Sequence, residues 1–251
     1  TEDVLIDNAE TGYKIGATIN MPKGDGPHKI VVFASGSGAQ DRDETIAEHK
    51  PFAVIADHLA YEGIGSIRFD DRGTGNSEGL YNETGIEGFA CDVKAVYSYI
   101  KKRYPESKIG LLGHSEGGMH IMITQKQVKT ADFMIFLACV GTTGEDVYLT
   151  QQYDFAIESE MTEEEAQEGV DFWKKVNEIN RTAKDPGSEL SKYFEEYYDS
   201  LDPDERAMVG NEMQFTMGML MLVNNPWFRE FNSFECKDYW KSMKKVPVLA
   251  I

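Results

Sequence analysis

Long apolar runs are missing from this sequence of 251 residues. The two longest, residues 133–140 and 217–223, fall well short of the roughly 20 residues that a membrane-spanning helix needs. Basic residues are also scarce: 25 Lys and Arg stand against 43 Asp and Glu, which gives a net charge of −18. Because nucleic acids and anionic lipids are bound mainly through Lys and Arg, we expect neither as a partner, and we expect no membrane span.

Cysteine is rare and shows no pairing pattern. Cys91, Cys139 and Cys236 are odd in number and form no CxxC pair, so the sequence predicts neither a disulfide framework nor a metal site. The first residue is Thr1 rather than Met, and we therefore expect that upstream sequence has been removed. The compartment stays open, because a cytoplasmic protein and a secreted or periplasmic protein both fit.

The negative charge is concentrated in one part of the chain. Residues 141–245 contain 23 acidic and 11 basic residues, a net charge of −12, together with all three Trp and seven of the Met residues. This stretch is helical and amphipathic in pattern. Thr162 begins a capping-box sequence, and the Asp-Pro pairs at 185–186 and 202–203 indicate turns between helices. Composition alone therefore predicts two regions.

The rest of the chain alternates between two patterns. Continuous apolar runs, typical of strands buried on both faces, are separated by segments with an apolar stripe at helical spacing. The predicted buried strands are residues 29–34, 64–69, 108–112, 133–138 and 246–251, and the predicted helices are 51–62, 87–104 and 117–128. Residues 4–6 and 13–20 precede them as a predicted hairpin. This order predicts an α/β fold, with a mostly parallel sheet and helices on both faces.

One motif carries the chemistry. Gly113-His114-Ser115-Glu116-Gly117 directly follows a predicted strand and opens a predicted helix. In this context G-x-S-x-G is a nucleophile elbow, a sharp turn that presents the serine hydroxyl while the glycines avoid clashes. We predict Ser115 as the nucleophile and the Glu116 amide as a donor to an oxyanion. The alternative is an ordinary glycine-rich turn with a buried serine.

A second glycine-rich loop, Ser35-Gly36-Ser37-Gly38, follows the first buried strand at 29–34. In the α/β-hydrolase arrangement the loop at this position supplies the other oxyanion amide, and we assign it to Ser37, with Gly38 as the next choice. A phosphate-binding loop is the rival interpretation. It fails because the third glycine of G-x-G-x-x-G would fall at Asp41. A structural turn without a catalytic role is the remaining alternative.

Four motifs stand in an order that resembles bacterial α/β-hydrolases. They are SGSGAQDRD at 35–43, DRGTGNS at 71–77, GHSEGG at 113–118 and PWFR at 226–229. The chain resembles the carboxylesterase branch often called serine aminopeptidase-like or dienelactone hydrolase-like. The resemblance implies an eight-stranded, mostly parallel sheet, a helical cap inserted after the sixth strand, no cofactor, and hydrolysis of esters or related acyl bonds of a small molecule.

The resemblance also implies a domain organisation. Residues 1–143 would form the hydrolase core, 144–241 the acidic helical cap, and 242–251 the return to the core. We expect Arg72 to tie loops together. We expect Asp41, Arg42 and Asp43 to buttress the glycine-rich loop at 35–38 through charge pairs, and the alternative for each is a solvated charge run. An acyl pocket under the cap would be lined by Trp227 and Phe228 and by Met213, Met217, Met219 and Met221, although plain packing is the commoner role of such residues.

The catalytic base is missing. A serine nucleophile needs a histidine oriented by an acid, in the chain order Ser, acid, His. After Ser115 the only histidine is His120, on the helix that the elbow opens; His114 is expected to face away, and His49 is expected to pack or lie on the surface. In the resembling family the acid and the histidine follow the strand that matches 246–251. We therefore expect a truncated chain, with the catalytic Asp and His and the last strand and helix beyond Ile251.

The sequence thus predicts a serine hydrolase that cleaves carboxylic esters through an acyl-enzyme on Ser115, with this chain itself nearly inactive. Thioester and peptide bonds stay open as substrate variants. The alternative is a non-catalytic ligand-binding module with a hydrolase fold, or an inactive fragment, and the absent histidine and acid favour it. Acyl and alcohol preference and the oligomeric state do not follow from the sequence.

Overall fold

The computed structural model describes residues 1–24 and 26–251, and the chain divides into two compact units. Residues 1–142 together with 235–251 form the first, which we call the sheet unit. Residues 143–234 form the second, which we call the helical unit. No helix in the described residues has the length and apolar character needed to cross a membrane.

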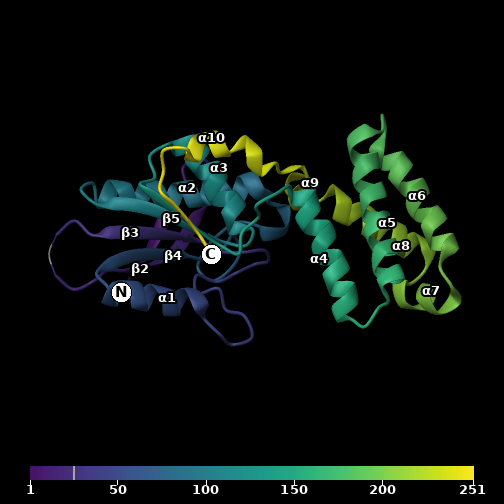
Figure 1. Cartoon of the computed structure of the whole chain (residues 1–251), viewed down its shortest axis with the longest axis horizontal. Coiled ribbons are helices and arrows are strands. Elements are labelled where there is room, and N and C mark those ends of the chain that lie inside the picture. The colour runs from purple at the N-terminus through teal and green to yellow at the C-terminus, as the bar shows by residue number, and fades with distance from the viewer. Residues whose placement is uncertain (25) are drawn as a thin grey trace. The chain divides into compact units, whose positions relative to one another are not determined.

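A mixed, mostly parallel sheet organises the sheet unit (Figure 1). Within the described residues it has seven strands in the order β1-β2-β4-β3-β5-β6-β7. Their bounds are β1 Glu2–Asp7, β2 Lys14–Asn20, β3 Lys29–Ala34, β4 Ile64–Phe69, β5 Lys108–His114, β6 Phe133–Leu137 and β7 Val248–Ala250. The five strands β4, β3, β5, β6 and β7, in sheet order, pair in parallel. Strand β2 pairs antiparallel with both β1 and β4. The α/β fold predicted from the sequence is confirmed.

Alternate side chains of the central strands enter two separate cores. Along β3, Ile30 and Val32 pack with the helices α2 (Ile86–Arg103) and α3 (Gly117–Val128), while Val31 and Phe33 pack with α1 (Pro51–Tyr61). Figure 1 shows α1 on one side of the sheet and α2 and α3 on the other. A strand with apolar residues at every position is therefore required here, because successive side chains point to opposite faces and both faces are covered.

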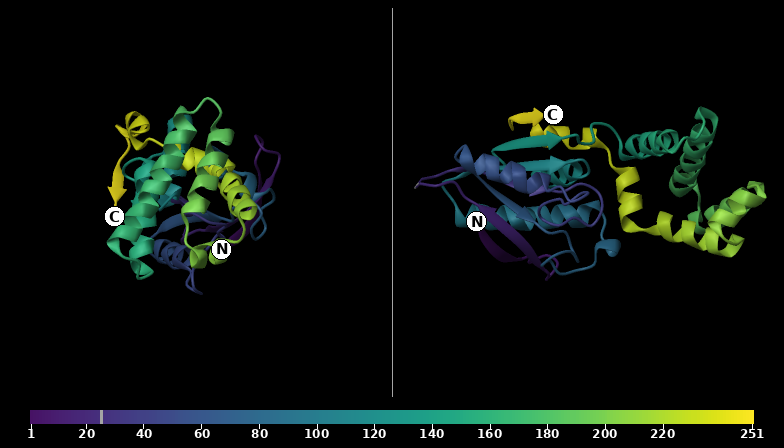
Figure 2. Two further views of the ribbon diagram at one scale, coloured as in Figure 1. Left: turned by 90° about the vertical axis from the view of Figure 1, so that its right-hand side faces the viewer. Right: turned by 90° about the horizontal axis from the view of Figure 1, so that it is seen from below.

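The two edges of the sheet differ. At one edge, β1 and β2 form the predicted hairpin (purple in Figure 2), and its turn brings Gly12 to a φ of 76°, a conformation that glycine adopts without strain. At the other edge, β7 pairs with β6. The prediction that this last strand is buried is wrong: Val248 and Leu249 are each about half exposed, since no described element covers their side chains.

Capping residues define the helices of the helical unit. Thr162 and Glu165 form the predicted capping box at the start of α5. The Asp-Pro pairs predicted as turns are also helix starts. The Asp185 carboxylate is the N-cap of α6 and accepts one backbone N–H group, and the Asp202 carboxylate is the N-cap of α7 and accepts two. The helices are α4 Gly144–Glu158, α5 Glu163–Thr182, α6 Pro186–Ser200, α7 Pro203–Val209, α8 Glu212–Asn224 and α9 Pro226–Ser233.

The helical unit has its own apolar core. Phe172 and Val176 of α5 pack against Phe194 of α6 and Phe228 of α9, and Phe172 is surrounded by further aromatic rings. The sequence predicts that the helical insertion runs to residue 241, whereas residues 235–251 group with the sheet unit. The reason is packing: the Cys236 sulfur lies 3.7 Å from that of Met122 on α3. The role of the helical unit as a cap stays a prediction.

The core of the helical unit yields a stability prediction. Phe194 is fully buried, so Phe194→Ala should lower the free energy of unfolding by about 3–5 kcal/mol through lost burial and the cavity left behind. Phe155 of α4 is 58% exposed, and Phe155→Ala should cost less than about 1 kcal/mol. Urea unfolding followed by circular dichroism measures both, and equal costs for the two variants would contradict this packing.

Candidate active site

Ser115 occupies a strained turn between β5 and α3. Its φ is 50°, a left-handed value that is uncommon for a residue other than glycine. The Ser115 amide donates to the Leu137 carbonyl (2.9 Å), which fixes the turn to the end of β6. A Cβ on Gly113 would lie 2.5 Å from the Gly117 carbonyl carbon, so the chain cannot reverse this tightly with a larger residue there. The strand-turn-helix context predicted for the G-x-S-x-G motif is confirmed.

The same turn lies directly against the end of β3. A Cβ on Gly117 would lie 2.3 Å from the Ala34 carbonyl oxygen and 2.6 Å from that of Ser35. This close approach brings the loop of residues 35–40, which we call the oxyanion loop, beside the serine. A Cβ built on Gly36 would lie 3.3 Å from both the Ser115 Cβ and the His114 Nδ1.

Of three successive amides of the oxyanion loop, the first and the third donate to side chains. The Gly36 amide donates to Glu44 Oε1 (2.7 Å), and the Gly38 amide donates to the Tyr81 hydroxyl oxygen (2.8 Å). Within the part of the chain that the structure describes, the Ser37 amide has no acceptor. The geometry therefore favours Ser37 over Gly38 as the oxyanion donor, although its catalytic role stays a prediction.

Three buried carboxylates hold this loop in place. Glu44 and Glu116 are each 1% exposed and Asp71 is 8% exposed. Glu44 binds the Gly36 amide; Glu116 Oε2 accepts from the Ser37 hydroxyl at 2.6 Å. Asp71 accepts from the Ser35 hydroxyl (3.0 Å) and the Gln40 amide (2.9 Å). Each carboxylate comes from a different segment of the chain, so hydrogen bonds to three separate segments hold the loop.

Burial in this cluster raises the pKa values of Asp71 and of Tyr81. Burial raises the pKa of Asp71 from 3.8 to about 7, and the negative charge of Glu116 adds to this effect while His120 opposes it. Burial also raises the pKa of Tyr81, and Glu116 and Asp71 raise it further, so this phenol stays protonated. Burial at the loop therefore favours the protonated forms of Asp71 and Tyr81.

Both histidines near Ser115 are paired with glutamates. His114 Nδ1 lies 2.8 Å from Glu44 Oε1, and this hydrogen bond raises the pKa of His114. The expectation that His114 faces away from the Ser115 hydroxyl stays a prediction, and its Nδ1 and the Gly36 amide bind the same Glu44 oxygen. His120 Nε2 lies 3.2 Å from Glu116 Oε1. Among the described residues neither imidazole hydrogen-bonds to the Ser115 hydroxyl, and exposed His49 makes only a backbone bridge with Ile46.

The charged residues after the oxyanion loop tie it to the sheet. Asp41 caps a local turn by accepting the amides of Asp43 and Thr45. Arg42 pairs with buried Asp70 at 2.5 Å, just after β4. Among residues 41–44, the side chain that hydrogen-bonds to the oxyanion loop is that of Glu44, which we did not predict. Its only sequence signal is its place at the end of an acidic run.

Arg72 and Asp43 form two further buried links. Arg72 pairs with Asp92 of α2 at 2.5 Å and donates to the Gly88 carbonyl. It therefore ties the loop after β4 to that helix, whereas we expected it to tie loops together. Asp43 pairs with Arg68 of β4. These pairs fix the scaffold beneath the serine rather than the reacting atoms.

The residues predicted to line an acyl pocket lie in the helical unit. Phe228 is buried in that unit's core, and Trp227 packs on Phe231 with ring centroids 5.1 Å apart. Met213, Met217 and Met221 are exposed on α8. A role for Trp227 and Phe228 toward substrate stays a prediction.

The described residues contain no group of three or more His, Cys, Asp or Glu side chains arranged to hold a metal ion.

Comparison with known proteins decides the family. Residues 27–156, just over half of the chain, match the family model described as serine aminopeptidase, S33. The chain belongs to this serine aminopeptidase family. The matched segment includes the oxyanion loop, the nucleophile elbow and the sheet from β3 to β6.

Known relatives of this serine aminopeptidase family member include esterases. Over 101 residues the chain is 36% identical to esterase EstD of Thermotoga maritima, in a match that covers 40% of this chain and 24% of EstD. The chain thus covers about a quarter of the length of this relative.

The chain also aligns with solved esterase structures. The Pyrococcus furiosus esterase Pf2001 aligns with 99% of this chain and 68% of its own, at a TM-score of 0.54 and 19% identity. Est1E of Butyrivibrio proteoclasticus, solved with ferulic acid bound, aligns with 53% of this chain and 51% of its own, at a TM-score of 0.45 and 23% identity. The Pf2001 alignment shows the α/β-hydrolase fold.

The Glu44–His114 pair gives a titration prediction. Because the Glu44 hydrogen bond raises the pKa of His114, Glu44→Gln should lower that pKa toward 6.5. The stabilisation from the pair is complete below pH 6.5 and is lost as the pH rises through the higher folded-state pKa. NMR titration of the imidazole measures this shift. Glu10→Gln, which removes an exposed carboxylate paired with Lys94, is the control; an equal shift there would contradict a direct effect.

The raised pKa of Asp71 gives a second prediction. The folded state favours the neutral acid, so ionisation of Asp71 should destabilise the fold increasingly as the pH rises from 3.8 to about 7. Asp71→Asn removes this ionisation and keeps a hydrogen-bonding oxygen. The free energy of unfolding of the variant, relative to that of the parent, should rise between pH 4 and pH 8 by up to about 4 kcal/mol, because one pKa unit corresponds to about 1.4 kcal/mol. Thermal unfolding across pH measures this, with exposed Asp3→Asn as control; parallel pH profiles for parent and Asp71→Asn would contradict it.

Proposed function

We propose that this protein is a serine hydrolase that cleaves carboxylic esters of small molecules through an acyl-enzyme on Ser115. The observation that carries the proposal is the left-handed serine at the β5–α3 turn, held beside a glycine-rich loop whose Ser37 amide has no acceptor among the described residues. The family membership and the esterase EstD match support the same reaction class.

The proposed reaction proceeds in two steps. The Ser115 Oγ attacks the acyl carbon, its proton passes to a base, and the carbonyl oxygen becomes an oxyanion held by the amides of Ser37 and Glu116. Collapse of this intermediate breaks the bond to the alcohol, which leaves with the proton. Water then attacks the acyl-enzyme in the same way and releases the acid. The expectation that an Asp and a His beyond Ile251 supply the base remains part of the proposal.

A second candidate function rests on the histidines. His114 and His120 are both committed to buried glutamates, so neither stands ready to take the Ser115 proton. Without a base the serine alcohol is a poor nucleophile at neutral pH. This observation favours a non-catalytic binding module, with the hydrolase fold retained as a scaffold.

Labelling of the complete protein by a fluorophosphonate separates the two candidates, because the proposal draws the catalytic base from beyond Ile251. An activated Ser115 should form a covalent phosphonyl adduct, detected as a single mass increase, and Ser115→Ala should abolish it. Hydrolysis of a p-nitrophenyl ester should fall by about a thousandfold or more in Ser115→Ala. Ser98→Ala, an exposed serine on α2, is the matched control and should leave both signals unchanged. An unlabelled Ser115 together with an unchanged hydrolytic rate in Ser115→Ala would support the binding module.

A further inference from the structure

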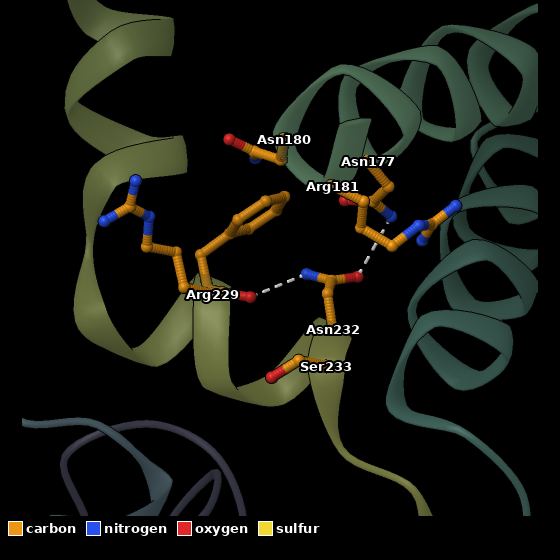
Figure 3. A pocket seen from close by; sticks show the side chains of 7 residues that line it. Asn177, Asn180, Arg181, Arg229, Asn232 and Ser233 are labelled. Carbon is orange, nitrogen blue, oxygen red and sulfur yellow. Dashed lines mark hydrogen bonds between the residues drawn. The ribbon is translucent and has the colours of Figure 1, made fainter. Parts of the chain in front are cut away.

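A cavity of about 320 Å³ lies within the helical unit, between α5 and α9 (Figure 3). The residues that line it are Asn177, Asn180, Arg181, Phe228, Arg229, Asn232 and Ser233. The helical unit contains 21 acidic and 7 basic residues, yet this lining has two arginines and no acid. Arg229 is therefore the one lining charge without an ion-pair partner among the described residues, because Arg181 is paired with Glu145.

Hydrogen-bonded carboxamides form one wall of the cavity. Asn177 is only 3% exposed, on a face of α5 that also carries the buried apolar Val170, seven residues earlier. Its Nδ2 donates to Asn232 Oδ1 (3.2 Å), and Asn232 Nδ2 donates to the Phe228 carbonyl (2.8 Å), as the dashed lines in Figure 3 mark. Because buried amides cost free energy unless they are bonded, this pair keeps a polar surface on an apolar helix face.

The two arginines lie on opposite sides of Asn232 in Figure 3. Arg181 is paired with Glu145 of α4. Arg229, in contrast, forms none of the ion pairs found in the described part of the chain, whereas several lysines of the same unit do. The exposed Arg229 guanidinium lines the same cavity as the asparagine amides. A guanidinium can bind a planar carboxylate through two parallel hydrogen bonds.

We propose that this cavity binds a small organic molecule that carries a carboxylate beside a hydrogen-bonding group such as an amide. The carboxylate would lie against Arg229, and the amide would bond to the Asn177–Asn232 wall and to Asn180. The acidic helical unit repels anions at long range, so selection depends on these short-range hydrogen bonds and disfavours a bare, more highly charged anion. The proposal is independent of the chemistry at Ser115.

Binding of succinamate tests the proposal. Succinamate has one carboxylate and one amide, its neutral diamide succinamide has the same shape, and neither is an ester. We expect succinamate to cause saturable changes in the side-chain amide signals of Asn177, Asn180 and Asn232 in NMR spectra of the full chain. Succinamide should bind at least about tenfold more weakly, since it lacks the charge that Arg229 recognises.

Variants of Arg229 localise the effect. Arg229→Gln should weaken succinamate at least about tenfold, and Arg229→Lys should weaken it less, because it keeps the charge and loses the planar fork. Lys192→Gln makes the same change of charge on exposed α6, outside the cavity, and should leave the affinity unchanged. Circular dichroism confirms that each variant is folded.

Three results would overturn the proposal. The first is no saturable change with succinamate, and the second is equal affinity for succinamate and succinamide. The third is an equal loss in Arg229→Gln and Lys192→Gln, which would show only the effect of net charge. Inorganic phosphate that binds as tightly as succinamate would overturn the ligand class assigned.

Discussion

The close approach of Gly117 to the end of β3 is the constraint on which the candidate site depends. The carbonyl oxygens of Ala34 and Ser35 occupy the space where any Cβ at Gly117 would stand, so the start of α3 and the end of β3 can meet only through glycine. That contact forces the reversal after β5, places Ser115 in the left-handed region, and sets the oxyanion loop beside it. Left-handed backbone at a serine costs about 1–3 kcal/mol, which the surrounding sheet and its two cores offset.

Buried carboxylates hold the oxyanion loop in one conformation beside Ser115. Glu44, Asp71 and Glu116 reach the oxyanion loop from separate segments and bind its amides and hydroxyls. Their desolvation is unfavourable, and their hydrogen bonds to the loop compensate it. These bonds fix the loop, and the proposed function requires that the Ser37 amide be positioned before a substrate binds. Such preorganisation is the main way in which enzymes stabilise an oxyanion, because no reorganisation is needed during the reaction.

The sequence predicts much of this fold because the signals are local. Apolar runs such as residues 29–34 specify strands covered on both faces, and the capping box at Thr162 specifies a helix start. The same reasoning predicts a buried final strand and is wrong there, because an apolar run does not reveal whether a neighbour covers it. Burial at β7 depends on elements that the run itself does not encode.

The candidate site was predictable only in part. Ser115 and the oxyanion loop carry glycine patterns that strict steric demands produce, so they can be read from the chain. Glu44 and the pairing of His114 cannot, because a glutamate in an acidic run looks the same whether it is solvated or 1% exposed. Contacts between residues 70 positions apart are set by the folded sheet, and no local pattern reports them.

The crystal structure of a phosphonate adduct tests the central claim most directly, namely that the turn at Ser115 and the carboxylate-held loop form one oxyanion site. The account predicts phosphorus bonded to the Ser115 Oγ and a phosphoryl oxygen within about 2.7–3.1 Å of the amides of Ser37 and Glu116. The Gly36 and Gly38 amides should still donate to Glu44 and Tyr81. A phosphoryl oxygen bound by the Gly38 amide instead, or an adduct on a residue other than Ser115, would contradict the account.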